Sequence, residues 1–155
     1  MQLTFDAHFD APIAEVFDHL TSSQLYQRLD ERSTVVITEH GSSRTLEVER
    51  AFDTSAVPSP VRSMVGEAIQ VSESTHWVKE GSGFSATFEV RTVGLPASFI
   101  GTIELSERKS FTAFSLSGNV KVNVPLIGAG LEKQVGEVLR LQLEDMVCQA
   151  QELLG

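Results

Sequence analysis

Cysteine is almost absent from this chain. Cys148 is the only one among 155 residues, so neither an internal disulfide nor a cysteine-based metal cluster can form within the sequence. The four histidines show no helical i, i+4 spacing, and none stands with carboxylates in a recognised metal motif. We therefore expect no metal and no cofactor, and the scarcity of cysteine fits a reducing compartment.

Clusters of positive charge and long hydrophobic runs are missing as well. The net charge is −9, and no run of lysine and arginine exceeds two residues. This argues against duplex nucleic acid and anionic membrane surfaces as partners. No stretch of about 18 apolar residues is present, so we expect no integral membrane association. The N-terminus also lacks the basic-then-apolar pattern of a signal peptide, and we expect a cytoplasmic protein.

Motifs for nucleophilic catalysis and phosphate binding are lacking too. The stretch Gly81-Ser82-Gly83-Phe84-Ser85 lies in a predicted hairpin and is followed by no helix, unlike a nucleophile elbow. Gly128-Ala129-Gly130 has neither the lysine nor the full spacing of a phosphate loop. We identify no catalytic residue.

The last thirty residues carry the clearest pattern that is present. From Pro125 to Leu154, apolar side chains recur at helical steps of three and four residues. A helix of roughly 25 residues is about 38 Å long, and its apolar stripe needs an equally long apolar partner. The stripe comprises Leu131, Val135, Val138, Leu139, Met146, Ala150 and Leu153.

The start of the chain predicts one strand followed by two short helices. Residues 2–9 alternate between polar and apolar side chains, as in a half-buried strand. Asp10-Ala11-Pro12 is typical of a helix start, with Asp10 as the N-cap and Pro12 in the first turn. A second short helix is expected around residues 25–29.

Six further strands are expected between residues 33 and 124. Asp53 to Gly66 contains Pro58 and Pro60 and cannot be regular strand. Because short turns join only antiparallel neighbours, these strands form a meander, and the first strand adds to one edge. The predicted fold class is α+β: a curved, seven-stranded antiparallel sheet around a long C-terminal helix, in a single domain over residues 1–155. The six strands are predicted at 35–39, 45–52, 68–79, 84–92, 98–105 and 111–124.

Two sequence stretches and the order of elements resemble helix-grip proteins of the SRPBCC superfamily. That superfamily includes START lipid-transfer domains, polyketide cyclases and birch-pollen-allergen-like proteins. Phe5 to Thr21 reads F-x3-F-D-A-P-x3-V-F-x2-L-T, and Asn119 to Glu132 reads NVKVNVPLIGAGLE. With Arg50, Trp77 and Gly94-Leu95-Pro96, the second stretch is similar to an uncharacterised, mainly actinobacterial branch. The resemblance implies a largely apolar cavity between sheet and helix with ligand binding as the usual role, and it implies no reaction.

Three charged residues lie on the same side of their predicted strand or helix as its apolar residues. Arg50 is in phase with the apolar positions of its strand, and Glu73 is in phase with those of the next strand. If residue 50 lies opposite residue 73, the two side chains meet on the core side of the sheet. Glu132 falls inside the helical stripe. Three interpretations stay open: a structural ion pair of Arg50 with Glu73 or Glu132, an exposed Glu132 favoured by the helix dipole, or the polar end of a ligand cavity.

Small residues on the inward faces indicate unfilled volume. Ala86, Gly101 and Gly118 lie in phase with large inward side chains, so we expect a cavity of a few hundred Å³. The residues expected to line it are Arg50, Glu73, Trp77, Phe88, Phe99, Ile103, Leu116, Leu131, Glu132, Val135, Leu139 and Met146.

The sequence favours a small binding protein for a hydrophobic or amphipathic small molecule, such as a lipid or a polyketide-like compound. We expect a monomer or a weak homodimer. One alternative is a cyclase- or aromatase-like enzyme in which inward Arg and Glu side chains perform acid–base chemistry. The other is an interaction module without a ligand, which contacts a partner through the sheet edge or the loop at Pro58–Pro60.

Overall fold

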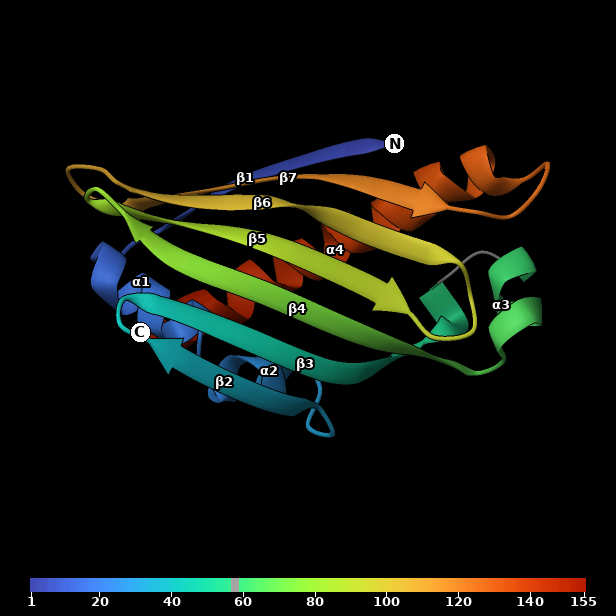
Figure 1. Cartoon of the computed structure of the whole chain (residues 1–155), viewed down its shortest axis with the longest axis horizontal. Helices are drawn as coiled ribbons and strands as arrows, with labels where there is room; N and C mark the ends of the chain where they lie inside the picture. Colours follow the sequence, from blue (N-terminus) through green and yellow to red (C-terminus); the bar gives the residue numbers. More distant parts are fainter. Residues whose placement is uncertain (57–58) are drawn as a thin grey trace.

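A single antiparallel sheet of seven strands dominates the computed structural model, which describes residues 1–56 and 59–155. The predicted meander is confirmed: the strand order is β1-β7-β6-β5-β4-β3-β2, so β1 adds to the edge beside β7 (Figure 1). Pro58 lies outside the described residues. The strands are β1 (Gln2–Phe9), β2 (Thr34–His40), β3 (Ser43–Asp53), β4 (Ala68–Glu80), β5 (Gly83–Thr92), β6 (Ala97–Glu107) and β7 (Thr112–Val122).

Helices lie before the meander, within it and after it. Two short helices, α1 (Ile13–Leu20) and α2 (Ser23–Leu29), follow β1, and the segment between β3 and β4 holds a 3₁₀ turn (Thr54–Ala56) and α3 (Ser59–Val65). The long helix α4 (Gly128–Leu154) ends the chain and confirms the helical pattern of the sequence.

The expected N-cap at Asp10 is wrong. The residue that precedes the first turn of α1 is Pro12, which caps it without a side-chain hydrogen bond. The backbone N–H of Asp10 instead donates to Gln151 Oε1 of α4 at 3.1 Å, so this segment ties the first strand to the last helix. The next helix is capped by its preceding residue, since the Ser22 hydroxyl accepts from the Leu25 N–H at 3.3 Å.

The long helix covers only part of the sheet. It crosses one face diagonally (Figure 1) and packs mainly against β7, β1, α1 and α2. The strands from β3 to β6 therefore present their inner side chains to α4 across a wider gap. At the far edge, β2 is covered least, and its Val36 and Ile37 are exposed.

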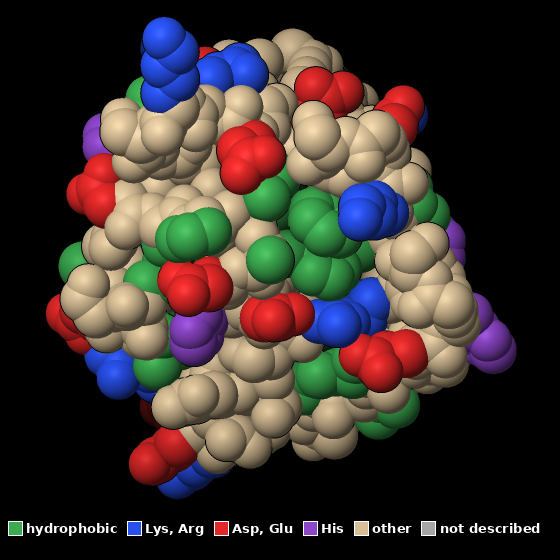
Figure 2. Space-filling model, turned by 90° about the vertical axis from the view of Figure 1, so that its left-hand side faces the viewer, with side chains coloured by type: hydrophobic (Ala, Val, Ile, Leu, Met, Phe, Trp, Pro, Cys, Tyr) green, Lys and Arg blue, Asp and Glu red, His purple; other side chains and the backbone are tan. Residues whose placement is uncertain are grey.

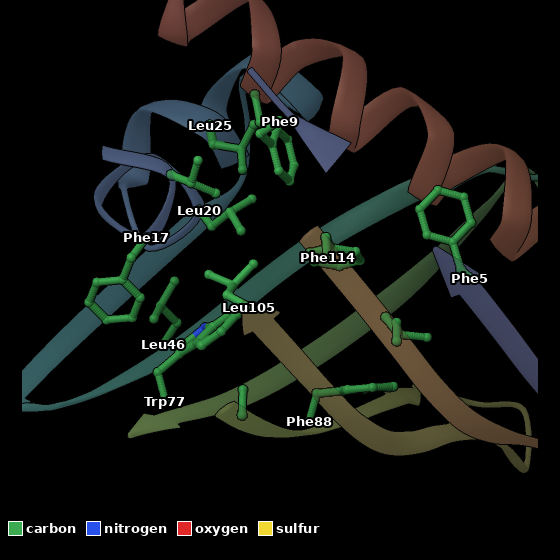
Figure 3. Packing of buried hydrophobic residues seen from close by; sticks show 14 of the residues in the cluster. Phe5, Phe9, Phe17, Leu20, Leu25, Leu46, Trp77, Phe88, Leu105 and Phe114 are labelled. Atoms are coloured by element: carbon green, nitrogen blue, oxygen red, sulfur yellow. The ribbon is translucent and has the colours of Figure 1, made fainter. Parts of the chain in front are cut away.

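An aromatic cluster fills the end of the molecule where α1 meets the sheet. Phe17 of α1 stacks on Phe84 of β5 with ring centroids 3.9 Å apart, and it meets Trp77 of β4 edge-on at 5.7 Å. Figure 3 shows Phe17, Trp77 and Leu46 together at this end, away from Phe88. This packing closes the end of the sheet to solvent.

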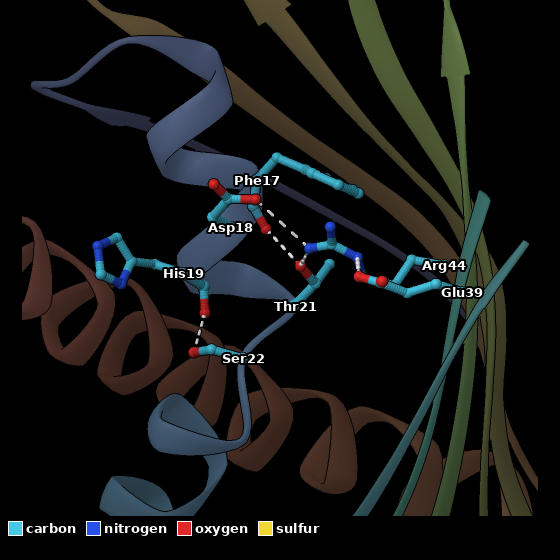
Figure 4. A network of polar contacts seen from close by, with 7 residues as sticks. All are labelled: Phe17, Asp18, His19, Thr21, Ser22, Glu39 and Arg44. Atoms are coloured by element: carbon cyan, nitrogen blue, oxygen red, sulfur yellow. Dashed lines mark hydrogen bonds and ion pairs between the residues drawn. The ribbon is translucent and has the colours of Figure 1, made fainter. Parts of the chain in front are cut away.

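Arg44 fastens the same end from outside. Its guanidinium lies 4.7 Å from the centroid of the Phe17 ring. Its Nη1 donates to Thr21 Oγ1 at 2.5 Å, and its Nε lies 2.9 Å from Glu39 Oε1. Asp18 is a further partner at 3.4 Å (Figure 4). Seen end-on, hydrophobic side chains gather in the middle of this surface and charged side chains surround them (Figure 2).

Gly101 and Gly118 lie opposite each other in β6 and β7. A Cβ on Gly101 would overlap the backbone carbonyl oxygen of Ser117, so only glycine allows the two strands to approach and curve in this way. A Cβ on Gly118 would come 2.5 Å from Phe99 Cε1 and 2.9 Å from Phe88 Cζ. The sequence-based idea that these glycines leave empty volume is therefore wrong, because two aromatic rings fill the space above Gly118.

We predict that Gly101→Ala lowers the free energy of unfolding by about 2 kcal/mol or more, because the new methyl group meets backbone that cannot rotate away. Denaturant unfolding measures this. The matched control is Gly130→Ala in the first turn of α4, where a Cβ meets nothing within 4 Å. That variant should be neutral or more stable by about 0.5–1 kcal/mol. Equal free energies of unfolding for the two variants would contradict the claim that β6 and β7 approach too closely for a side chain at position 101.

Candidate ligand-binding cavity

A cavity of about 200 Å³ lies between the concave face of the sheet and α4. Strands β3 to β7 form its floor, α4 covers it, and Tyr26 and Leu29 of α2 close one side. Most of the lining is apolar. The apolar side chains include Phe52, Ile69, Val71, Phe88, Val90, Leu95, Phe99, Ile103, Phe114, Leu116, Val135, Val138, Leu139, Leu143 and Met146.

The apolar stripe of α4 is not fully packed where it faces the cavity. Val135, Leu139, Leu143 and Met146 point towards the sheet, yet each is only half-buried. Near the two ends of the helix, Leu131 and Ala150 are buried at 3% and 1% exposure. The side of α4 that faces β1 and β7 is thus well packed, and the side that faces the cavity keeps part of its apolar surface uncovered.

One ion pair forms the polar corner of the cavity. Arg50 Nη2 donates to Glu73 Oε1 at 3.0 Å, and Arg50 Nε lies 2.9 Å from Glu73 Oε2. The side chains are only 10% and 15% exposed. The guanidinium also lies 4.6 Å from the centroid of the Phe52 ring, which buries its flat face. The pair thus has one hydrogen bond and one close charge contact, because Arg50 Nε and Glu73 Oε2 make no hydrogen bond to the described residues. A charge-assisted hydrogen bond of this kind is stronger than one between neutral groups.

The ion pair between Arg50 and Glu73 is confirmed, but the expected register is wrong by two residues. Arg50 lies opposite Val71, and Glu73 lies opposite Val48. The partners are therefore diagonal neighbours on the same face of the sheet, a separation that long side chains bridge.

Tyr26 adds a hydroxyl group beside this pair. Burial raises the pKa of Tyr26 well above its ordinary value of 10.0, and the negative charge of Glu73 raises it further while Arg50 opposes the change. A phenol in this environment keeps its proton at all physiological pH values. The cavity therefore has a neutral hydrogen-bonding group next to its ion pair.

Thr92 of β5 also lines the cavity, and its hydroxyl donates to the Leu95 carbonyl oxygen at 2.5 Å. Three more polar side chains line it: Thr75 of β4, Ser98 of β6 and Gln142 of α4. None of their side chains makes a hydrogen bond to the part of the chain that the structure describes. Each is half-buried rather than sealed in the core, so each remains available to a molecule inside the cavity.

The structure places nine of the twelve residues expected at the site on the cavity wall; whether they bind a ligand stays a prediction. These are Arg50, Glu73, Phe88, Phe99, Ile103, Leu116, Val135, Leu139 and Met146.

The other three lie elsewhere, which corrects the expectation. Trp77 points inward, but Phe17 covers it. Leu131 does not line the cavity; it is buried in a cluster with Leu95 and Val122, of which Leu95 reaches the cavity wall.

Glu132 faces the β7 end of the sheet rather than the cavity. The Val122 N–H donates to its Oε1 at 3.2 Å, and the N-terminal ammonium group lies 3.4 Å from its Oε2. The hydrogen bond from Val122 lowers the pKa of Glu132 below its ordinary value of 4.5, and the ammonium group adds to the effect. Glu132 thus does not pair with Arg50 and does not line the cavity; it fastens the start of α4 to β7.

Sequence reasoning missed Tyr26 and Gln142. Gln142 follows Val135, Val138 and Leu139 at helical spacing, so a polar residue within the stripe was a visible signal. For Tyr26 no comparable signal exists, because its placement depends on how α2 folds back towards β3.

A model of a protein family described as being of unknown function, DUF2505, matches residues 4–151. The chain belongs to the DUF2505 family. No curated protein matches it. Within the described residues, no helix is both long and apolar enough to cross a membrane.

Solved structures with this fold are similar to the DUF2505 chain. TTHA0849 from Thermus thermophilus has 16% identity and a TM-score of 0.68, with 98% of this chain and 95% of that chain covered. Human STARD10 has 10% identity and a TM-score of 0.64, with 96% and 62% covered. Ara h 8.0201 has 12% identity and a TM-score of 0.60, with 99% and 96% covered. At these identities the likeness shows the fold alone, which is the helix-grip fold.

We predict that Arg50→Ala lowers the free energy of unfolding by about 3–5 kcal/mol, because it leaves the Glu73 carboxylate unpaired in a nearly dry site. Thermal and denaturant unfolding measure this. Arg91→Ala is the matched control, since Arg91 also pairs with a strand carboxylate, Glu89, but is 58% exposed. The control substitution should lower the free energy of unfolding by less than about 1 kcal/mol. An unchanged midpoint for Arg50→Ala would refute the buried pair.

Proposed function

We propose that this protein binds a small apolar or amphipathic molecule in the cavity between the sheet and α4. The observation that carries the proposal is an apolar volume inside the fold, bordered by one ion pair and several unpaired polar groups. Concave sites with mostly apolar walls and a few convergent polar groups are typical of small-molecule binding.

The size of the cavity limits the ligand. A volume of about 200 Å³ exceeds the roughly 150 Å³ of an engineered apolar cavity that binds benzene. It is smaller than the about 300–1,000 Å³ of pockets for drug-sized ligands. One or two rings, or a short acyl chain, fit this space.

Fold neighbours support the same class of ligand. The Zhui aromatase/cyclase from Streptomyces sp. R1128 shares the fold at 12% identity and a TM-score of 0.56, with 98% of this chain and 89% of that chain covered. Its name indicates ring-shaped products. We therefore favour an aromatic or polyketide-like ligand over a long lipid.

The geometry does not favour the enzyme alternative. A cyclase-like mechanism needs an inward carboxyl group that is free to exchange protons, but Arg50 holds Glu73, and Glu132 lies outside the cavity. The interaction-module alternative remains a prediction, and a mass that rises with concentration would support it.

We predict that the neutral two-ring dye 1-naphthylamine binds the wild-type protein with a gain in fluorescence, and that Leu139→Trp weakens this binding at least tenfold. Leu139 lines the cavity, and an indole there fills space that the dye would occupy. A fluorescence titration measures the effect.

Leu141→Trp is the matched control for this variant. Leu141 lies two residues further along α4 and is 63% exposed, so an indole there leaves the cavity unchanged. Equal dye affinity in both variants would contradict the proposed site. Failure of the dye and of pooled lipid extracts, tested by native mass spectrometry, to bind the wild-type protein would contradict the proposed function.

A further inference from the structure

We infer that the cavity selects neutral ligands, such as alcohols, ketones or phenols, over carboxylates of the same shape, and that the neutral polar end lies at the corner formed by Arg50, Glu73 and Tyr26. This inference rests on the proposed function and specifies the chemistry of its ligand.

The charges on the cavity wall cancel. Among the described residues that line it, only Arg50 and Glu73 carry a formal charge, and they bind each other at 2.9 and 3.0 Å. An entering carboxylate would lose its hydration and find no free counter-ion. The net charge of −9 for the whole chain disfavours anions further.

An anion could gain a partner only by separating the pair. Taking Arg50 from Glu73 would leave the Glu73 carboxylate at 15% exposure with no cation beside it. Removal of one partner from a buried pair is strongly unfavourable, because the other charge stays desolvated. The Arg50–Glu73 pair therefore disfavours a carboxylate ligand, which an unpaired arginine would attract.

A neutral oxygen meets suitable partners without this penalty. No hydrogen bond joins Arg50 Nη1 to the described residues, so Nη1 can donate to a carbonyl or hydroxyl oxygen while Nη2 stays bonded to Glu73 Oε1 and Nε stays 2.9 Å from Glu73 Oε2. Tyr26 offers a protonated phenol on the same side. On α4, the Gln142 amide can donate and accept. These groups match an uncharged ligand end that itself donates or accepts one or two hydrogen bonds.

The test compares 1-naphthalenemethanol with 1-naphthoate as competitors of 1-naphthylamine at pH 7.5. The two competitors share one ring system and differ mainly in charge. We expect the alcohol to displace the dye from the wild-type protein at a concentration at least tenfold lower than the carboxylate. Equal or tighter binding of the carboxylate would overturn the inference and leave the proposed function intact. If the dye and both competitors fail to bind, the proposed function fails and this inference with it.

Two variants test the cause of the selectivity. Glu73→Gln frees the charge of Arg50, so the carboxylate should gain at least tenfold relative to the alcohol. The double variant Arg50→Gln/Glu73→Gln removes both charges and should keep the preference for the alcohol. If a folded Glu73→Gln protein keeps the wild-type ratio of alcohol affinity to carboxylate affinity, the proposed role of the ion pair is overturned. If Glu73→Gln does not fold, the affinity ratios of the wild-type protein and the double variant are the test, and a loss of the preference for the alcohol in the double variant would overturn the inference.

Discussion

The width of the sheet relative to a single helix is the constraint on which the rest of this structure depends. Seven strands spaced about 4.8 Å apart place the outer strands roughly 29 Å from each other. A helix with its side chains is only about 10–12 Å across. Since α4 packs mainly against β7 and β1, the inner face of β3 to β6 needs another cover. The short helices α1 and α2 supply part of it, and the remainder is cavity.

The position of the cavity follows from where the helix is fastened. At its start, Glu132 accepts from the Val122 N–H and Leu131 is buried beside Val122. Towards its end, Gln151 accepts from the Asp10 N–H, and Arg28 of α2 donates to Gln149 at 2.9 Å. The middle of α4, between these contacts, faces the sheet through half-buried side chains. In the same stretch, Arg140 Nη2 donates to the Thr4 carbonyl oxygen at 3.0 Å and Gly136 is buried beside Met1 and Leu3. The helix is therefore fastened along the β1–β7 edge, and its side chains towards β3 to β6 border the apolar volume.

The Arg50–Glu73 pair is compatible with this arrangement because it lies at the border of the cavity rather than in the packed core. Its contacts pair the two charges and join β3 to β4 on the concave side. The same contacts leave no net charge on the wall. Stability and ligand preference thus depend on the same two residues.

Much of this fold could be predicted from the sequence, because alternation and helical spacing record which side of each element is buried. Arg50 and Glu73 were placed on the inner face in this way. Residues whose surroundings come from other elements could not be placed: Trp77 does point inward, but Phe17 of α1 covers it. Glu132 lies in the helical stripe, yet the stripe does not reveal where the sheet ends. Tyr26 depends on the path of α2, which no local pattern specifies.

Xenon binding tests most directly whether α4 leaves an apolar volume above the sheet. Xenon enters apolar cavities without needing hydrogen bonds, so it reports the volume independently of any natural ligand. A crystal structure of the ligand-free protein under xenon pressure should show xenon between α4 and the sheet, in contact with Val135, Leu139 and Phe99. An absence of xenon there, with these side chains packed together, would contradict the account.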